Sequence, residues 1–211
     1  MGSVLPDLVQ EEFVDRLHAC SPEALAEATT VALWLHYQEL RRWNPRLSLV
    51  GPGTASRVVE RHYGEALAAL PLLEGALSLL DVGSGAGFPG LVLAAARPGL
   101  AVTLIEARQR KWAFLQSAVR RARLSCQCLN ARVGAALEIG RVDLVVWRAL
   151  RLPEAAVVRL ASRSERMLVW SGADEPSPPA GWRPERRILL AQSKERRIVE
   201  WVKARKEERG S

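Results

Sequence analysis

A glycine-rich segment is the part of this chain best suited to bind a ligand: Asp81-Val82-Gly83-Ser84-Gly85-Ala86-Gly87-Phe88-Pro89-Gly90. It follows an apolar run at 76–80, which predicts a short buried strand, and precedes an apolar run at 91–96, which predicts a helix. Glycines at such a junction let the backbone turn sharply and approach a ligand closely, because no Cβ stands in the way. The N-terminus of the following helix offers free N–H groups to a carboxylate or a phosphate.

An acidic residue, Glu106, stands where a second ligand contact is needed. It ends another apolar run, 101–105, which predicts the next strand. An acid about 20 residues beyond a glycine loop, at the tip of the next strand, is placed to accept hydrogen bonds from both hydroxyls of a ribose. The centre of the chain is therefore expected to be a nucleoside-binding strand–helix–strand unit.

Two nucleoside cofactors fit the glycines in different registers. Counted from Gly85, the loop satisfies G-x-G-x-x-G, which favours a nicotinamide dinucleotide, but this register begins two residues after the strand and places Pro89 at the helix start. Counted from Gly83, directly after the strand, it reads acid-x-G-x-G-x-G followed by the bulky Phe88, a form used for S-adenosylmethionine (SAM). We expect SAM, with a glycine-rich turn that binds nothing as the alternative.

Composition limits the class of protein. The chain has 211 residues, 48% of them hydrophobic, enough for one compact unit, which we divide into a helical lead-in (1–73) and a SAM-binding domain (74–211). A net charge of +7 favours a polyanionic partner, although it also serves solubility. Three cysteines without C-x-x-C spacing predict neither a disulfide nor a zinc site. No leader or membrane-spanning run is recognisable, so we expect a cytoplasmic protein without a metal.

Strands and helices alternate along the chain. The remaining strands are expected at 124–129, 143–147, 167–170, 187–191 and 197–202, and the remaining helices at 7–20, from Ser21 to about Trp43, from Thr54 onward, at 108–123 and at 153–162. Residues 174–184 are expected to form a loop. This order predicts an α/β fold with a doubly wound, mostly parallel seven-stranded sheet. The last two strands have no helix between them, so an antiparallel pair closes the sheet, as in class I SAM-dependent methyltransferases.

Ligands in open α/β sheets bind at the carboxyl ends of the strands. Besides the glycine loop and Glu106, this rule selects residues 131–134 and Trp147-Arg148. Backbone N–H groups near Val133 and Gly134 are expected to contact an adenine edge. Arg148 is either a contact to the SAM carboxylate or a phosphate, or an exposed loop arginine. His62 and the seven tryptophans are more easily explained by packing than by chemistry.

Several segments together resemble the RsmG (GidB) family, which methylates N7 of one guanine in 16S ribosomal RNA. The resemblance covers most of the chain and rests on the glycine segment 81–90, Leu104-Ile105-Glu106-Ala107 with Lys111 and Phe114-Leu115, Asn130-Ala131-Arg132-Val133, Arg148-Ala149, Trp43-Asn44, Arg61-His62 and Glu195-Arg196. It implies SAM contacts from Gly83, Phe88, Val133, Gly134 and Arg148.

The chain departs from the family pattern at several positions. It has Ser48-Leu49-Val50 where the family usually has Asn-Leu-Thr, Gly134 where an acid is usual, and Trp147 where a serine commonly precedes the arginine. Gly134 still offers a backbone N–H to adenine but provides no carboxylate. The changes at Ser48 and Val50 bear on the expected RNA side.

The implied reaction explains why no acid–base pair stands out. Guanine N7 carries an in-plane lone pair, so it can attack a methyl group once the two are aligned, without a general base. N7 lies on the major-groove edge, which side chains cannot reach in A-form RNA, so the target guanine must be unpaired or splayed out. No residue is assigned as catalytic; Arg132, Arg148 and Arg196 are candidates for positioning RNA or SAM.

The last hairpin, together with the loop after the third strand, is the expected RNA-binding surface. Its basic residues Lys194, Arg196, Arg197 and Lys203 are close in sequence to strands that border the ligand end, although basic residues on an edge strand also discourage aggregation. The partner is then 16S ribosomal RNA or the small-subunit particle, with the chain acting as a monomer. Two other classes stay open: a nicotinamide-dependent oxidoreductase, for which no Tyr-x-x-x-Lys pair is present, and a non-catalytic RNA-binding protein with a degenerate SAM fold.

Overall fold

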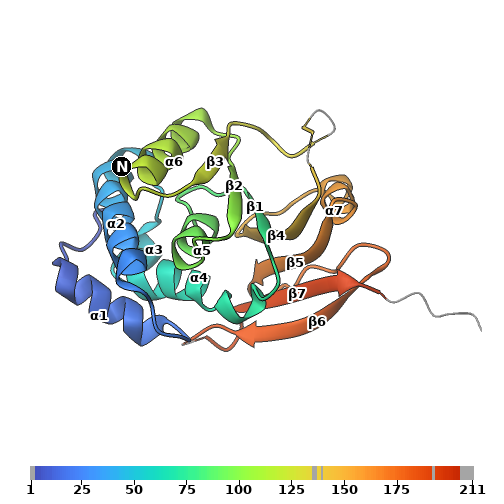
Figure 1. Ribbon diagram of the computed structural model, residues 1–211, viewed down its shortest axis with the longest axis horizontal. Helices are drawn as coiled ribbons and strands as arrows, with labels where there is room; N and C mark the ends of the chain where they lie inside the picture. Colours follow the sequence, from blue (N-terminus) through green and yellow to red (C-terminus); the bar gives the residue numbers. More distant parts are fainter. Residues whose placement is uncertain (1–2, 135–136, 139, 192, 205–211) are drawn as a thin grey trace, which may run out of the picture.

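The computed structural model describes residues 3–134, 137–138, 140–191 and 193–204. A seven-stranded sheet runs through the molecule in the order β3-β2-β1-β4-β5-β7-β6 (Figure 1). Its strands are β1 (Ser78–Val82), β2 (Ala101–Ile105), β3 (Cys126–Leu129), β4 (Val142–Arg148), β5 (Ser164–Ser171), β6 (Trp182–Leu189) and β7 (Arg197–Lys203). The first five strands are parallel, and β7 is antiparallel to both β5 and β6. The predicted sheet and its closing antiparallel pair are confirmed.

The two faces of the sheet are covered differently. Helices α5 (Gly90–Ala96) and α6 (Gln109–Arg121), with the lead-in, pack on one face, while α7 (Glu154–Ala161) lies on the other (Figure 1). Side chains alternate between these faces, so Leu79 joins the first core and Leu80 the second. Because parallel strands are buried on both faces, they appear in the sequence as unbroken apolar runs.

The lead-in consists of helices that share the first core with the sheet. They are α1 (Gln10–Cys20), α2 (Glu27–Leu47), α3 (Pro52–Ala55), the π-helix η1 (Val59–Gly64), α4 (Glu65–Leu67) and the short 3₁₀ helix η2 (Leu70–Leu72). Phe13 and Leu33 of the lead-in belong to the same buried cluster as Leu91 of α5. The lead-in is therefore packed as a continuous part of the fold, and the boundary at residue 73 stays a prediction.

The expected limits of the long lead-in helix are wrong at both ends. Helix α2 begins at Glu27 rather than at Ser21, because Glu23 pairs with Arg97 next to α5 (2.5 Å) and Ala26 is extended. It continues through Pro45 to Leu47, because a proline in the last turn removes only one hydrogen-bond donor. Ser48, in the left-handed region at φ 48°, then ends the helix.

Thr54 does not cap a continuous helix, contrary to the expectation. It lies inside α3, where Pro52 occupies the first turn, and its hydroxyl contacts His62 Nε2 at 2.9 Å. The following segment is divided into the π-helix η1 and the short helix α4. Single π-helical turns of this kind are frequent at functional sites.

The last hairpin also differs in detail from its expectation. Strand β6 starts at Trp182, inside the segment predicted as a loop, and tolerates Pro184 because it is an edge strand with a register shift there. Lys203 lies at the wrong edge for the expected RNA surface. It pairs with Trp182 in register, while Arg197 pairs with Ser171 at the carboxyl end of β5. Lys203 therefore belongs to the edge opposite the ligand end.

Two further observations concern the described residues alone. None of their helices combines the length and the apolar character that a membrane crossing requires. Within the same residues, no three or more histidine, cysteine or acidic side chains are grouped as a metal would need.

Candidate active site

The glycine loop and Glu106 are brought together at the carboxyl ends of β1 and β2. The N–H groups of Gly83 and Ser84 donate to the Ile105 carbonyl at 2.8 and 3.0 Å. The Gly85 N–H donates to Glu106 Oε2 at 3.1 Å. Gly83 and Gly85 have positive φ angles of 75° and 54°, which only glycine adopts readily. The two features that the sequence placed about 20 residues apart therefore form one site.

The space above Gly85 fits a ligand that carries a ribose. A Cβ added at Gly85 would meet only the Gly83 carbonyl at 3.7 Å and Glu106 Oε2 at 4.0 Å. The Glu106 carboxylate also accepts a hydrogen bond from the Arg108 N–H at 2.7 Å through Oε1. Each of its oxygens retains acceptor capacity for a hydroxyl, because a carboxylate oxygen has two lone pairs. The open cradle and this carboxylate suit the adenosine part of SAM.

Asp81 supports the loop from within the sheet. Its Oδ2 accepts a hydrogen bond from the Gly90 N–H at 3.0 Å, which fixes the start of α5. Gly90 must be a glycine, because a Cβ there would lie 2.6 Å from the Asp81 Cβ. Burial raises the pKa of Asp81 to about 7, and its Oδ1 has no hydrogen-bond partner among the described residues. Asp81 thus stabilises the loop as a buried carboxyl group.

The raised pKa of Asp81 makes stability depend on pH. Between the ordinary value of 3.8 and the folded value of about 7, the folded state holds a proton that the unfolded state has lost. Stability should therefore fall as the pH rises through this window, and Asp81→Asn should remove that slope. The free energy of unfolding lost across this window is a few kcal/mol at most, since one pKa unit corresponds to about 1.4 kcal/mol. Urea unfolding of both proteins at a series of pH values measures it; parallel pH profiles would contradict the assignment.

His36 is a supporting residue that the sequence did not identify. Burial lowers its pKa to about 4, so the imidazole is neutral. Its Nε2 donates to the Ala86 carbonyl of the glycine loop at 2.9 Å, and its Nδ1 accepts from the Tyr63 hydroxyl at 2.7 Å. The lead-in helix α2 is thereby joined to the glycine loop. A histidine within an apolar helix was the only signal in the sequence.

The ring of Phe88 faces the lead-in. Its centroid lies 5.5 Å from that of His36, 5.1 Å from that of His62 and 4.9 Å from that of Tyr63. Burial and the nearby Arg148 lower the pKa of His62 to about 3, which agrees with the packing role considered for it. A SAM contact from Phe88 stays a prediction.

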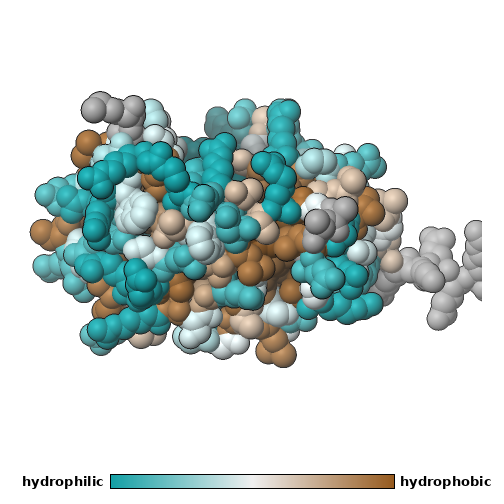
Figure 2. All heavy atoms as spheres, turned by 90° about the horizontal axis from the view of Figure 1, so that it is seen from above, coloured by the Kyte–Doolittle hydropathy of each residue, from teal (hydrophilic) through white to brown (hydrophobic). Residues whose placement is uncertain are grey.

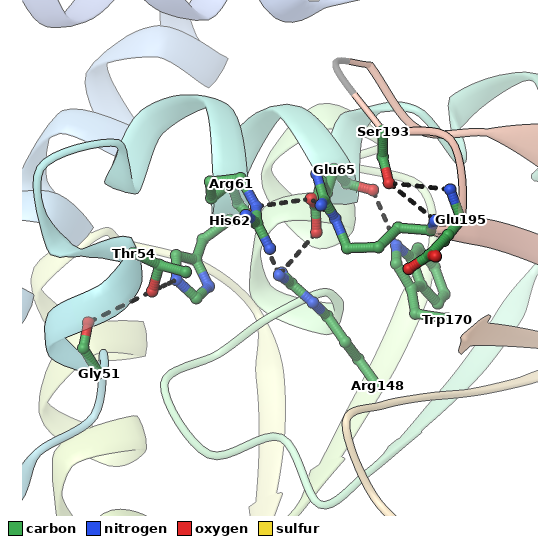
Figure 3. Close-up of polar contacts among 10 residues, drawn as sticks. Gly51, Thr54, Arg61, His62, Glu65, Arg148, Trp170, Ser193 and Glu195 are labelled. Atoms are coloured by element: carbon green, nitrogen blue, oxygen red, sulfur yellow. Dashed lines mark hydrogen bonds and ion pairs between the residues drawn. The ribbon is translucent and has the colours of Figure 1, made fainter. Parts of the chain in front are cut away.

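Arg148 is a paired arginine with 13% of its side chain exposed, rather than an exposed loop arginine. It stands next to Gly83, one residue beyond the Val82–Trp147 pair of the β1–β4 ladder. Its Nη2 donates to Glu65 Oε2 at 2.8 Å and to the Arg61 carbonyl at 2.6 Å (Figure 3). Its Nη1 is buried without a partner among the described residues. The contact of this donor with an anion stays a prediction.

The Glu65 carboxylate accepts hydrogen bonds from arginines in three parts of the chain. Its Oε1 also accepts from Arg61 Nε at 3.0 Å and from Arg196 Nε at 2.9 Å. Its backbone carbonyl accepts from the Trp170 indole at 2.8 Å, which ties α4 to β5 (Figure 3). Two of the three arginines proposed from the sequence, Arg148 and Arg196, are therefore joined by an acid that the sequence did not single out.

The end of β3 forms the other border of the site. Asn130 Nδ2 donates to the Glu106 carbonyl at 2.9 Å, which joins the ends of β2 and β3. Among the described residues, a Cβ at Gly134 would meet only the Arg132 carbonyl at 4.0 Å. Arg132 and Val133 follow Asn130 on the same connection; Arg132 is exposed and Val133 is half-buried. Their contacts with adenine or RNA stay predictions.

A pocket of about 950 Å³ lies beside the glycine loop, at the carboxyl ends of β4 and β5. Its walls include the edges of Trp147, Trp170 and Trp201, and the residues after β5 form its rim. Leu150, also in its wall, touches the glycine loop: a Cβ at Gly83 would lie 2.7 Å from the Leu150 side chain. The pocket and the glycine loop are therefore neighbours.

The hairpin cations are more often paired than free. Arg197 pairs with Glu175 at 3.7 Å, and Lys203 pairs with Glu165 at 2.8 Å. The face of the molecule seen from above in Figure 2 is largely hydrophilic, with a hydrophobic band near its middle. Of the expected hairpin cluster, Arg196 is the residue that the structure joins to the candidate site.

Comparisons with solved structures agree with the fold. The mitomycin 7-O-methyltransferase MmcR superposes with a TM-score of 0.56 at 18% identity, covering 92% of this chain and 67% of that one. A SAM-dependent methyltransferase from Aquifex aeolicus superposes with a TM-score of 0.54 at 17% identity, covering 70% and 93%. At such identities the likeness concerns the fold, which is that of class I SAM-dependent methyltransferases.

Comparisons of sequence identify the family. The family model described as GidB, rRNA small subunit methyltransferase G, matches residues 30–176. A ribosomal RNA small subunit methyltransferase G from Methylobacterium radiotolerans is 39% identical over 157 residues, covering 73% of this chain and 72% of the relative. One from Myxococcus xanthus is 39% identical over 121 residues, covering 55% and 56%. The chain belongs to the GidB family of SAM-dependent ribosomal RNA small subunit methyltransferases.

Proposed function

We propose that this chain transfers the methyl group of SAM to N7 of a guanine in 16S ribosomal RNA. The observation that carries the proposal is the open cradle over Gly85, bordered by the Glu106 carboxylate, in a chain of the GidB family. The names of the relatives support the RNA class, and the net charge of +7 suits a polyanionic substrate.

The residues of the site serve binding and alignment. SAM, when bound, supplies an electrophilic methyl group. The glycine loop and Glu106 orient its adenosine part, and Arg148 offers Nη1 to its carboxylate. Guanine N7 needs no proton removed, so holding the two reactants in line accounts for the catalysis required here.

The target guanine enters the pocket beside the SAM cradle. A volume of about 950 Å³ is within the range of small-molecule sites and accommodates a splayed-out nucleotide. The apolar side chains in the walls of the pocket and the hydrogen-bond acceptors at its border suit a guanine base, which must leave its stack to expose N7. The chain acts as a monomer in the cytoplasm under this proposal, on 16S RNA either free or within the small-subunit particle.

Transfer of labelled methyl groups tests the activity. The purified chain is incubated with methyl-labelled SAM and with naked 16S RNA, small subunits or 23S RNA in parallel. We expect label in 16S RNA in at least one of its two forms and none in 23S RNA. Binding of SAM without label in either form of 16S RNA would favour a non-catalytic RNA-binding protein. Binding of NADH in place of SAM would favour an oxidoreductase.

A further inference from the structure

Glu65 lies where three segments far apart in the sequence meet. It is 4% exposed, and its carboxylate accepts hydrogen bonds from Arg61 of the π-helix, Arg148 of β4 and Arg196 of the hairpin at 2.8–3.0 Å. Figure 3 shows Arg61 and Arg148 converging on this carboxylate from different segments. The single negative charge of the Glu65 carboxylate is thus paired with three guanidinium groups.

The cluster of Glu65 and its three arginines carries more positive than negative charge. Three guanidinium groups around one carboxylate leave a formal surplus of two positive charges, and Arg148 Nη1 is buried with no partner among the described residues. A buried charged donor is expected to have a partner when the protein is at work. Arg61 and Arg196 keep 24% and 27% of their side chains exposed, so they can reach a ligand from solvent. The surplus positive charge and the exposed parts of Arg61 and Arg196 favour binding of an anion.

The position of the cluster indicates which anion each arginine serves. The register of β1 and β4 places Arg148 beside Gly83 of the glycine loop. Arg196 immediately precedes β7, whose first residue pairs with Ser171 at the same edge of the sheet. Arg196 therefore lies at the ligand end of the sheet, and Arg61 is joined to it through the Glu65 carboxylate.

We propose that Glu65 is a positioning residue, which holds Arg61 and Arg196 to bind a phosphate of ribosomal RNA beside the SAM cradle. The inference rests on the proposed RNA substrate. Two flexible arginines fixed in advance lose less entropy on binding than two free ones, so a shared acid raises their affinity for a phosphate. Arginine also recognises phosphate with paired N–H donors, which makes its orientation important.

The direction in which Glu65→Gln changes the affinity for RNA distinguishes a positioning role from a purely electrostatic one. Glu65→Gln removes a negative charge near the RNA, so electrostatic attraction alone predicts tighter RNA binding. If Glu65 positions the arginines, the same substitution should weaken binding of a 16S RNA fragment several-fold. Glu65→Asp keeps the charge on a shorter side chain and should restore part of the affinity. Filter binding at several salt concentrations measures both variants.

Glu200 provides the matched control. It is also buried and accepts hydrogen bonds from two arginines, from Arg166 at 3.2 Å and from Arg186 through both carboxylate oxygens, but it pairs with Leu168 in the middle of the sheet. Glu200→Gln should lower stability without weakening RNA binding. RNA binding by folded Glu65→Gln that equals or exceeds that of the wild type would overturn the proposal, as would equal weakening in Glu200→Gln.

Arginine variants keep the proposal testable if Glu65→Gln does not fold. Arg61→Gln and Arg196→Gln should each lower the affinity and reduce the salt slope by about one unit, the change expected for one lost phosphate contact. An unchanged slope in either variant would overturn the proposal. Filter binding reports RNA affinity and not methyl transfer, so these results stand apart from the labelling experiment. RNA binding that follows the predictions without methyl transfer would overturn the proposed activity alone.

Discussion

Gly85→Val is expected to abolish SAM binding while the fold persists. The space above Gly85 is open in the structure, with the nearest atoms at 3.7 and 4.0 Å, and it borders Glu106. A valine side chain would fill the volume that the adenosine part of SAM requires. Isothermal titration calorimetry should show no measurable binding.

Backbone strain needs its own control, because Gly85 has a φ of 54°. Placing a side chain in the left-handed region costs roughly 1–2 kcal/mol for L-residues. Gly75 has a φ of 73° with nothing within 4 Å of an added Cβ, and it lies before β1, at the opposite edge of the sheet. Gly75→Val should lose comparable stability and bind SAM as the wild type does. Undiminished SAM affinity in folded Gly85→Val would refute the site.

Glu106→Ala is expected to weaken SAM roughly tenfold or more. Removing the carboxylate leaves the ribose hydroxyls and the Gly85 N–H without their acceptor, which typically costs ~1–3 kcal/mol. Glu106→Gln keeps one acceptor oxygen and should fall between alanine and the wild type. Calorimetric dissociation constants of the three proteins provide the comparison.

Asp143 is the matched control for Glu106. Its carboxylate also accepts hydrogen bonds from backbone N–H groups, those of Leu77 and Ser78 at 2.8 and 2.9 Å, but at the amino end of β1. Asp143→Ala should lower stability and leave the SAM affinity unchanged. If Asp143→Ala weakens SAM as much as Glu106→Ala does, the effect of Glu106 is structural and the ribose contact is wrong.

The contact between the glycine loop and Glu106 was predictable because it depends on order along the chain. A strand, a glycine turn, a helix and a second strand ending in Glu106 bring that acid back to the loop, wherever the rest of the chain lies. The structure confirms this with the 3.1 Å contact between the Gly85 N–H and the Glu106 carboxylate. The sheet was predictable for a similar reason, since alternating strands and helices leave few topologies.

The arginine cluster was not predictable, because its contacts join distant segments. Glu65 and Arg196 are separated by 131 residues, and Glu65 and Arg148 by 83. Only the Arg61–Glu65 pair, four residues apart on one helical segment, left a trace in the sequence. His36 escaped notice for the same reason, since its partner Ala86 lies 50 residues away.

The predicted helix boundaries were wrong where tertiary contacts outweigh the local capping preference of the residues. Ser21 and Thr54 resemble helix N-caps, yet Ser21 is the C-cap of α1 and Thr54 lies inside α3. Two positions that depart from the family pattern are explained by packing: Val50 is 1% exposed, and the ring of Trp147 packs against that of Trp201 at 5.5 Å. These two departures therefore fall in the core, where a hydrophobic side chain is suitable.

Mapping methylated nucleotides in cellular ribosomal RNA tests the central claim most directly. RNA from cells with the protein is compared with RNA from cells lacking it and from cells that carry only Gly85→Val. Chemical cleavage at N7-methylguanine, read by primer extension along 16S RNA, locates the modification. We expect one N7-methylated guanine in 16S RNA that is present with the wild-type protein and lost in both other strains. An identical pattern of N7 methylation in all three would contradict the proposed function.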